Sequence, residues 1–435
     1  MQKTAKEIWL VLALLVLTVG LLGNVWSIWN LEHKWDSRTN NAASNSALEQ
    51  SICAVTTGVV FASCDNQGNR VQFRDIIASH DLGEALFLNA RAAIRGKPNR
   101  LTDLAQHNYL IIILGIVIMA VVVYSSQNIL TLLAFLSVTL PIAATGLSPG
   151  YHAAHIGIAV LSITPALVMV FASSRSWSWL KYGLAMVLAT LAFSIAAVFR
   201  EVIALMGFLT LIVVAGLIVF KRPALKTWVF AAIAVVLTAL FYKGQAMINY
   251  FGLWYYSLPP SSNVTGHGFG HALFLGLGEV PNKFGIVWND SYGVQVGKQL
   301  NPMVEASSND YYDLLRNQYF AVLQSDPLEV LRIYGAKLIK VSLDKGNLFF
   351  IVLAAGVYLY GGAMARKAVS NRSLLARQYL EYRLLGLIAL LMIGLFTLQA
   401  VIINSGFIYF APSQSFTTLL FALGLGQVLN QGVKS

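Results

Sequence analysis

Residues 201–220 read EVIALMGFLTLIVVAGLIVF, an apolar run whose single charge is at its first position. The hydrocarbon core of a bilayer is about 30 Å thick, so a helix needs about 20 apolar residues to cross it. Because lipid offers no partner to a backbone amide or carbonyl, a segment that spans it in this way forms a helix. This stretch therefore predicts a transmembrane helix.

Similar runs recur along most of the 435 residues. Hydrophobic residues make up 57% of the chain and charged residues 11%, proportions that do not describe a soluble protein. We predict an all-α polytopic membrane protein with about ten transmembrane helices. Their expected ranges are 8–29, 108–124, 128–146, 153–171, 179–199, 201–220, 225–242, 347–365, 382–403 and 407–429.

Two long, more polar stretches interrupt these runs and divide the chain. We expect a first transmembrane helix (1–29), a first periplasmic loop with interfacial helices (30–107) and transmembrane helices two to seven (108–243). A second periplasmic loop (244–346) and the last three transmembrane helices (347–435) follow. Residues 73–107 combine apolar positions with basic ones, a pattern typical of an amphipathic helix near the membrane interface.

The distribution of charge predicts the orientation. If the N-terminus is cytoplasmic, the cytoplasmic segments hold 13 of the 30 Lys and Arg residues but only Glu7 and Glu381 of the 19 acidic residues. The whole net charge of +11 then lies on the cytoplasmic side, as the positive-inside rule expects. We therefore expect both termini in the cytoplasm, and the basic composition gives no support to nucleic-acid binding.

The first hydrophobic segment is expected to remain as an anchor, because it is long for a signal peptide and has no small-x-small cleavage site before Asn30. Cys53 and Cys64 then lie in an outer loop, where an oxidising compartment favours a disulfide between them. Two unpaired thiols are the alternative. Two cysteines alone make a poor metal site, so none is expected there.

Residues 266–302, GHGFGHALFLGLGEVPNKFGIVWNDSYGVQVGKQLNP, differ most from the apolar runs and are the predicted centre of the functional site. His267 and His271 are four residues apart, but Gly268 and Gly270 disfavour a helix and there is no HExxH motif, so metal ligation is not expected. The glycines permit close backbone approach and present amides to a polar ligand. The two histidines and Asp290 are therefore candidate substrate-binding residues.

An acid pair follows the first transmembrane segment. Glu32 and Asp36 are four residues apart, so both carboxylates can share one helical face close to the membrane surface. A solvated turn in which Lys34 and Arg38 act as counter-ions is the alternative interpretation.

Other ionisable side chains are expected at the outer membrane surface. His152 and His155 occupy one outer turn and Arg200 another, where the arginine either lines the site or snorkels toward the lipid head groups. Lys337 and Lys340 lie on a helix whose start is predicted by Asp-Pro-Leu-Glu at 326–329. These lysines either anchor the helix to head groups in general or bind one particular polyprenyl phosphate.

This layout resembles the GT-C superfamily of integral-membrane glycosyltransferases. The resemblance rests on a first outer loop with an acid soon after the first span, here Asp36, on short-looped middle spans, and on a second large outer loop late in the chain. The stretch HGFGHALFLGLGEVPNKFGIVWND at 267–290 is also similar to a segment of bacterial membrane proteins of suspected GT-C type. The family's acid often stands in an Asp-Glu or Glu-x-Asp context, whereas three residues separate Glu32 from Asp36 here.

The resemblance implies an inner-membrane enzyme with a periplasmic active site and a polyprenyl-phosphate sugar as donor. A carboxylate, Asp36 with Glu32 beside it, would deprotonate a hydroxyl of a glycan, lipid or protein acceptor, whose attack inverts the anomeric carbon. The cations expected to hold the phosphate are Arg200, Lys337 and Lys340, and the groups expected to orient sugar or acceptor are His152, His155, His267, His271 and Asp290. No cofactor is required, and a divalent metal is not indicated.

Two other functional classes remain open. A transporter or flippase of a lipid-linked glycan would carry ionisable residues in mid-membrane and internal repeats. The predicted spans have almost no charge at their centres, and no internal repeat is found. A ligase or polymerase of the O-antigen type would share the outer site and the lipid-linked donor.

Overall fold

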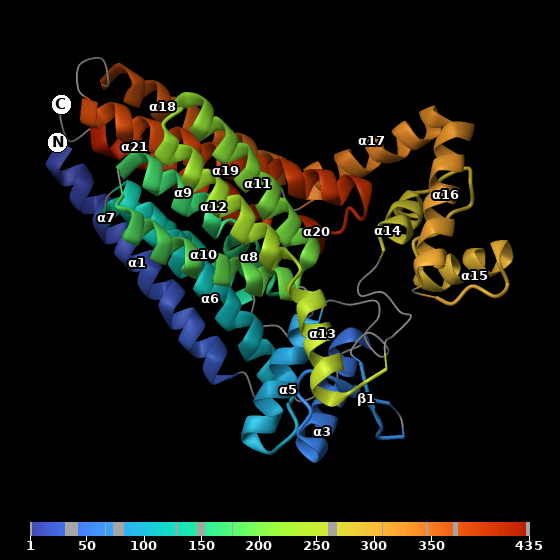
Figure 1. The fold of residues 1–435 in the computed structure, drawn as a ribbon. Helices are drawn as coiled ribbons and strands as arrows, with labels where there is room; N and C mark the ends of the chain where they lie inside the picture. Colours follow the sequence, from blue (N-terminus) through green and yellow to red (C-terminus); the bar gives the residue numbers. More distant parts are fainter. Residues whose placement is uncertain are drawn as a thin grey trace.

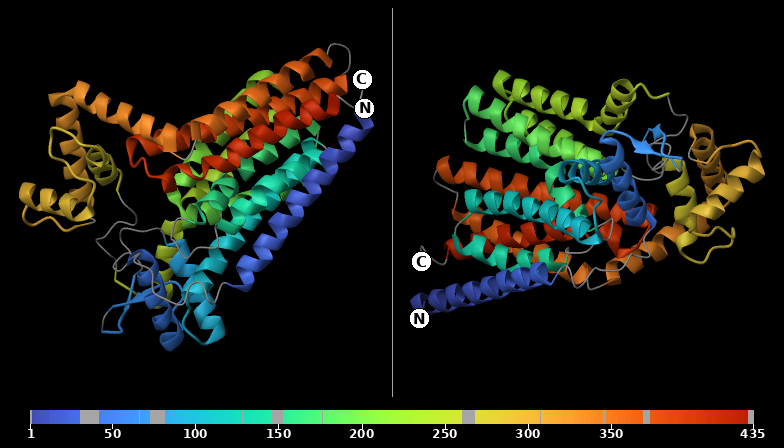
Figure 2. Two further views of the ribbon diagram at one scale, coloured as in Figure 1. Left: turned by 180° about the vertical axis from the view of Figure 1, so that it is seen from behind. Right: turned by 90° about the horizontal axis from the view of Figure 1, so that it is seen from below.

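The structure is a computed structural model that describes residues 2–30, 42–65, 67–72, 82–127, 129–145, 153–175, 177–259, 268–306, 308–344, 347–368 and 373–431. Long helices form a bundle, and two loop units project from one end of it (Figures 1 and 2). The start of the first described helix and the end of the last one lie close together at the opposite end of the bundle (Figure 1). We call these two ends of the bundle the loop end and the terminal end.

The bundle is built of long, mostly apolar helices. Its core contains aliphatic and aromatic side chains from across the sequence, including Phe193, Met392 and Phe396. The helices are α1 (Gln2–Trp29), α6 (Leu101–Ser126), α7 (Ile129–Thr145), α8 (His155–Ser162), α9 (Thr164–Arg175), α10 (Trp179–Phe199), α11 (Glu201–Lys221), α12 (Leu225–Tyr242), α18 (Asn347–Ala368), α19 (Ser373–Ile402), α20 (Phe407–Phe410) and α21 (Ser413–Gln431).

Among the described residues, six helices are long and apolar enough to cross a membrane. They are Leu101–Ser126, Trp179–Phe199, Glu201–Lys221, Leu225–Tyr242, Asn347–Arg366 and Arg377–Ile402, and a bent pair, α8 with α9, would be a seventh. The chain is therefore a multi-pass, all-α membrane protein. The other predicted crossings correspond to α1, α7 and α21 and stay predictions.

The expected span 153–171 is not one straight helix. The structure bends it by 40° between α8 and α9. Pro165 has no amide hydrogen to donate to the carbonyl of Leu161, and the Thr164 hydroxyl donates to that carbonyl instead, at 2.7 Å. The helix therefore breaks at Ile163, without leaving the Leu161 oxygen unpaired.

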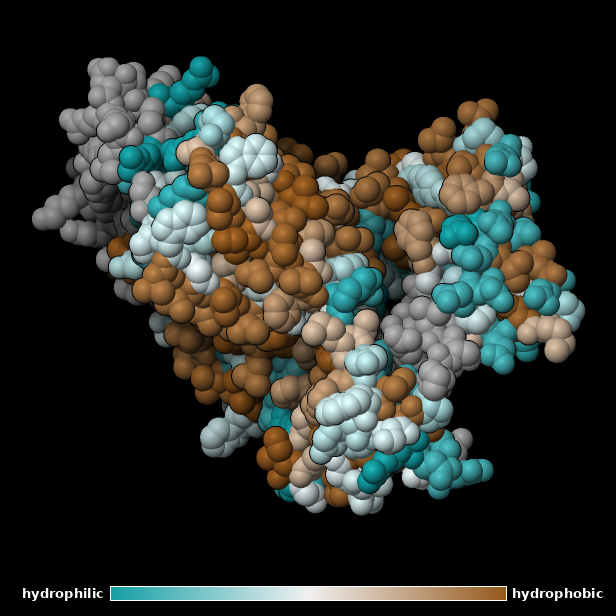
Figure 3. Space-filling view, in the orientation of Figure 1, coloured by the Kyte–Doolittle hydropathy of each residue, from teal (hydrophilic) through white to brown (hydrophobic). Residues whose placement is uncertain are grey.

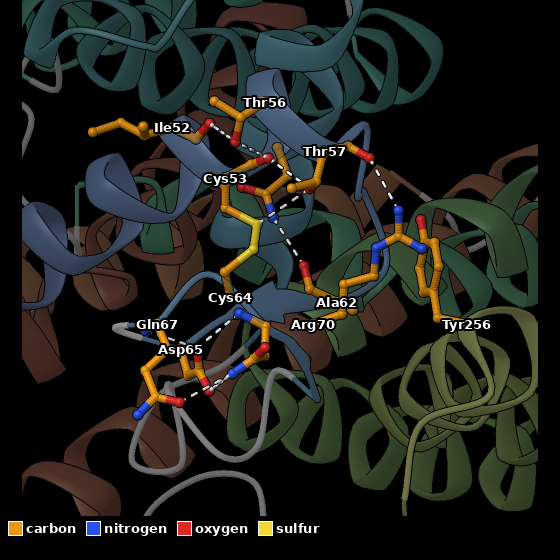
Figure 4. The surroundings of a disulfide bond; sticks show 12 residues. Ile52, Cys53, Thr56, Thr57, Ala62, Cys64, Asp65, Gln67, Arg70 and Tyr256 are labelled. Carbon is orange, nitrogen blue, oxygen red and sulfur yellow. Dashed lines mark hydrogen bonds between the residues drawn. A yellow bond between two sulfur atoms is a disulfide. The ribbon is translucent and has the colours of Figure 1, made fainter.

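The first loop unit contains α3 (Ala42–Thr57), the short antiparallel strands β1 (Ser63–Cys64) and β2 (Arg70–Val71), and α5 (Gly83–Arg95). The predicted disulfide between Cys53 and Cys64 is confirmed and links α3 to β1 (Figure 4). Asp65 closes the turn between the strands by accepting hydrogen bonds from the amides of Gln67 and Asn69. The expected amphipathic helix is represented by α5, and residues 73–81 lie outside the described part of the chain.

Helix α13 (Gly244–Tyr256) joins the start of the second loop to the first loop unit. The Tyr256 hydroxyl accepts a hydrogen bond from the amide of Val60, at 3.1 Å, and the Arg70 guanidinium lies 5.6 Å from the Tyr256 ring centre (Figure 4). Gly252 lies against the carbonyl of Phe61. The two loops are thus connected by direct contacts near the disulfide.

Removing the disulfide should loosen the first loop unit. We expect the double substitution Cys53→Ser with Cys64→Ser to cost about 2–3 kcal/mol, because the cross-link restricts the unfolded loop. Hydrogen exchange of α3 amides, followed by mass spectrometry with and without reductant, measures this. Wild-type protein without reductant is the reference, and unchanged exchange of α3 in the variant would contradict the prediction.

The second loop unit contains α14 (Phe269–Gly276), the 3-10 turn η1 (Leu277–Glu279), α15 (Asp290–Leu300), α16 (Asn309–Ser325) and α17 (Pro327–Leu343). Its own core is formed by Leu275, Leu277, Leu315 and Ile333, each fully buried. The predicted start of α17 is confirmed, since the Asp326 side chain accepts a hydrogen bond from the amide of Glu329 at 2.9 Å.

Candidate functional site

A buried histidine lies at the centre of the glycine-rich segment. The imidazole of His271, on α14, is 7% exposed and contacts two groups: its Nδ1 lies 2.8 Å from the Tyr311 hydroxyl, and its Nε2 lies 3.1 Å from Asp290 Oδ1. A carboxylate can only accept, so Nε2 carries the hydrogen in the neutral ring. Nδ1 is then an acceptor, and Tyr311 donates to it.

The two partners of the histidine differ in exposure. Tyr311, on α16, is buried, and burial raises the pKa of its hydroxyl, so that it stays a hydrogen-bond donor. The Asp290 side chain is 72% exposed. The result is a carboxylate that solvent or a ligand can reach and that a buried histidine holds in place.

Local sequence explains how these three side chains meet. Asn289 caps α15 by accepting from the amide of Ser291 at 2.8 Å, which places Asp290 in the first turn. Gly293 faces the histidine and the tyrosine, because a Cβ there would lie 2.9 Å from the Tyr311 hydroxyl and 3.3 Å from the His271 ring. Gly293 therefore allows close packing of α15 against α14 and α16.

One expectation about this segment was wrong. Gly268 and Gly270 disfavour a helix by propensity, yet Phe269–Gly276 is helical. Both glycines lie against Tyr312 of α16, where a side chain would clash. Tertiary packing therefore outweighs the low helix propensity of glycine here.

The site continues onto the loop end of the bundle. Burial raises the pKa of Tyr409, on α20; Arg200 lowers it, and Asp290 and Glu279 raise it further. Arg200, at the junction of α10 and α11, is thus close enough to Tyr409 to act on it electrostatically, and so is Asp290. A cation, a phenol and an exposed carboxylate gather where the second loop unit meets the bundle.

The two lysines expected to bind phosphate have different surroundings. Lys337 is fully buried and donates to the carbonyls of Gly276, Ile402 and Ile403 at 2.9, 3.2 and 3.0 Å. An ammonium has three hydrogens, so these contacts occupy its donors. Lys340 is 53% exposed and lies 3.1 Å from Glu279.

Glu279 joins the second loop unit to the end of α19. Its carboxylate accepts from the amide and hydroxyl of Ser405 at 2.5 and 2.6 Å and lies 3.5 Å from the Lys337 amine. Burial raises the pKa of this carboxyl, but the Ser405 hydrogen bonds and the two lysines outweigh it and leave the pKa lowered. Lys337 and Glu279 thus form a structural joint beneath the His271 helix.

The remaining predicted site residues are placed as follows. Asp36, Glu32, His267 and His152 lie outside the described residues. His155 begins α8 inside the bundle and is buried. Within the described ranges, there is no group of three or more His, Cys, Asp and Glu side chains arranged to hold a metal.

Sequence reasoning missed Tyr311, Tyr409 and Glu279. Tyr311 lies 40 residues after its histidine. Nothing local distinguishes it from its neighbour Tyr312, which is also buried. Glu279 stood among the glycines of the predicted centre and was overlooked because its partners come from residues 337–405.

Another acid in the first loop unit is in an unusual state. Glu84 is buried, and its Oε1 has no hydrogen-bond partner among the residues that the structure describes. Burial raises its pKa to about 8. The carboxyl is therefore mostly protonated at neutral pH and is a poor general base there.

A groove of ≈ 400 Å³ runs between α7, α18 and α21. It is mainly apolar, and the exposed residues Phe350 and Leu353 line it on α18, which is long and apolar enough to cross a membrane. Asn347, Ser413 and Gln414 line it toward the loop end, and the buried Ser413 hydroxyl has no hydrogen-bond partner in the described part of the chain. The volume and the mainly apolar lining of the groove suit a hydrocarbon chain that enters from the lipid.

Comparison with known proteins does not assign a family. No family model matches the chain, and neither the curated proteins nor the solved structures contain a match. Function therefore has to be inferred from the chemistry of the site.

Proposed function

We propose that this protein is a membrane glycosyltransferase that moves a sugar from a polyprenyl-phosphate donor to an acceptor hydroxyl at the periplasmic face. The observation that carries the proposal is the exposed Asp290 carboxylate, held by buried His271 at the loop end of a membrane bundle near Arg200 and Tyr409. Such a site combines a carboxylate that accepts hydrogen bonds from sugar hydroxyls with a cation that binds a phosphate. It lies at the end of the membrane bundle, where we expect the head groups of lipid-linked substrates.

The proposed reaction needs a base and a stabilised leaving group. Asp36 remains our candidate for the base, with Glu32 beside it. It takes the proton of the acceptor hydroxyl as the oxygen attacks the anomeric carbon from the side opposite the phosphate. The glycosidic bond forms, the carbon–oxygen bond to the lipid phosphate breaks, and the configuration inverts. Arg200 stabilises the negative charge on the departing phosphate.

Asp290 has a separate role in this proposal. A carboxylate accepts hydrogen bonds from sugar hydroxyls, and the hydrogen bond from His271 fixes its orientation. Lys340 is the exposed lysine available to a phosphate, whereas the contacts of Lys337 favour a structural role. The groove between α7, α18 and α21 would accept the isoprenoid chain of the donor.

The test is transfer of labelled sugar in proteoliposomes from a panel of polyprenyl-phosphate sugars. We expect Asp36→Asn to lower the rate about 100-fold or more, because a general base is lost. Asp290→Asn should lower it about tenfold, because an amide accepts hydrogen bonds from sugar hydroxyls less strongly than a carboxylate does. Asp313→Asn, at an exposed carboxylate of α16 that pairs with Arg316, is the matched control.

Three results would contradict the proposal, in one residue role or as a whole. Undiminished transfer by Asp36→Asn would remove that residue from the base role. Movement of an intact lipid-linked glycan across the bilayer, with no covalent product from any donor in the panel, would favour the transporter class instead. A product made from a pyrophosphate-linked oligosaccharide donor would favour the ligase or polymerase class.

A further inference from the structure

Helix α17 has an apolar face that no part of the described chain covers. Its buried face carries Val330, Ile333, Lys337 and Val341 and packs on the second loop unit and the end of α19. The opposite side exposes large aliphatic side chains, namely Leu328 (75%), Leu331 (65%), Leu338 (46%), Ile339 (62%) and Leu343 (71%). We call these five residues the leucine stripe.

The stripe follows from helical geometry. At 3.6 residues per turn, positions 328, 331, 335, 339 and 343 recur on one side of a helix, and position 338 lies at the edge of that side, two turns after 331. Gly335 lies among them without a side chain, and Arg332, which pairs with Glu329, also lies on this side. Five large exposed aliphatic groups on one face of a 17-residue helix exceed the scattered apolar residues of an ordinary protein surface.

The stripe continues into a surface that lies in lipid. Only residues 344–346 separate α17 from α18, which is long and apolar enough to cross the membrane. The first turns of α18 expose Leu348, Phe349, Phe350 and Val352. The helix extends sideways from the bundle (Figures 1 and 2), and hydrophobic residues are visible along it as they are on the bundle (Figure 3).

We propose that α17 lies in the bilayer interface, with the leucine stripe buried in the hydrocarbon of the leaflet at the loop end. The partner is thus the lipid surface itself. Arg332 and Lys340 are about half exposed on the same helix, where Arg332 pairs with Glu329 and Lys340 with Glu279. Their exposed parts place positive charge at head-group level in this proposal. An interfacial helix of this kind has one apolar face in lipid and basic groups at head-group level.

The consequence concerns the position of the His271 site. Lys337 and Glu279 join α17 to the end of α14 and to the residues that follow α19. A helix fixed in the interface therefore fixes the second loop unit, with Asp290, at the membrane surface. This inference does not depend on the reaction that the site performs.

Site-directed fluorescence tests the proposal. The native cysteines form a disulfide, so an introduced cysteine is the single thiol available for an NBD label. Leu331→Cys and Ile339→Cys report on the stripe. Lys298→Cys on α15 and Gln324→Cys on α16 are matched controls at exposed polar positions of the same unit. Each labelled protein is reconstituted in phospholipid vesicles that contain doxyl-labelled lipids, and iodide is the aqueous quencher.

We expect doxyl lipids to quench the label at 331 and 339 at least threefold more strongly than at 298 and 324, and iodide to show the reverse order. Equal quenching at all four positions would overturn the proposal. Protection of 331 and 339 from both quenchers would also overturn it, because protein, such as a second copy of this chain, would then cover the stripe.

Discussion

Lys337→Met is expected to destabilise the second loop unit by about 3–5 kcal/mol, the usual cost of removing one partner of a buried charged network. Methionine keeps most of the aliphatic volume but leaves the carbonyls of Gly276, Ile402 and Ile403 without their donor. The Glu279 carboxylate also loses the cation 3.5 Å away. Amides of α14 should then exchange at least about 100-fold faster, as measured by hydrogen exchange.

Lys340→Met is the matched control for this substitution. Its amine is on the next turn of the same helix and contacts the same carboxylate, but its side chain is 53% exposed. A surface ion pair contributes about 1 kcal/mol at most. If the two variants increased the hydrogen exchange of α14 equally, the assignment of Lys337 as the residue that joins α17 to α14 would be wrong.

The same lysine predicts a pH dependence. Burial, partly offset by Glu279, lowers the pKa of Lys337 to about 8, below the ordinary lysine value of 10.5. Between these values the unfolded chain binds more protons than the folded one, so this group makes the unit more stable as pH rises from 8 to 10.5. Lys337→Met should remove that slope, which is a second readout of the same prediction.

Gly270→Ala is expected to cost about 3 kcal/mol, at the upper end for an overpacked site. A Cβ at Gly270 would lie 2.8 Å from the amide nitrogen of Arg316 and closer still to the carbonyl of Tyr312. Because these are backbone atoms of α16, no side-chain rotation relieves the clash. Helix α14 would have to move, and His271 would be displaced from Tyr311. Thermal unfolding in detergent measures the cost.

Gly335→Ala provides the comparison. Gly335 is also within a helix, but no atom of the described residues lies within 4 Å of the position that its Cβ would take. Alanine there should stabilise α17 by about 1 kcal/mol through helix propensity alone. The two substitutions make the same chemical change and should shift the unfolding temperature in opposite directions. Shifts of the same sign would contradict the clash at Gly270.

The membrane class, the all-α fold and the start of α17 could be predicted from the sequence, because each depends on local pattern. The disulfide could be predicted because the chain has only two cysteines and both were expected in one outer loop. An apolar run of about 20 residues has few alternatives to a spanning helix. Asp326 and Pro327 determine a helix start through bonds within one turn.

The roles of the two lysines could not be predicted, because they depend on distant partners. Spacing places Lys337 and Lys340 on one helix, but the carbonyls that bury Lys337 belong to residues 276, 402 and 403. For the same reason, the tyrosine that holds His271 was not distinguished from its neighbours. Helix propensity also failed to predict the helix at residues 269–276, where packing against α16 compensates for the low helix propensity of glycine.

The positions of the two terminal helices bear on the number of crossings that we expect. The start of α1 and the end of α21 lie at the same end of the bundle (Figure 1). We therefore expect an even number of crossings between them. The six straight helices and the bent pair α8–α9 that are long and apolar enough to cross a membrane make seven, an odd number, so this expectation needs an odd number of further crossing helices. Helices α1, α7 and α21 pack in the same bundle, and one crossing by each would restore parity.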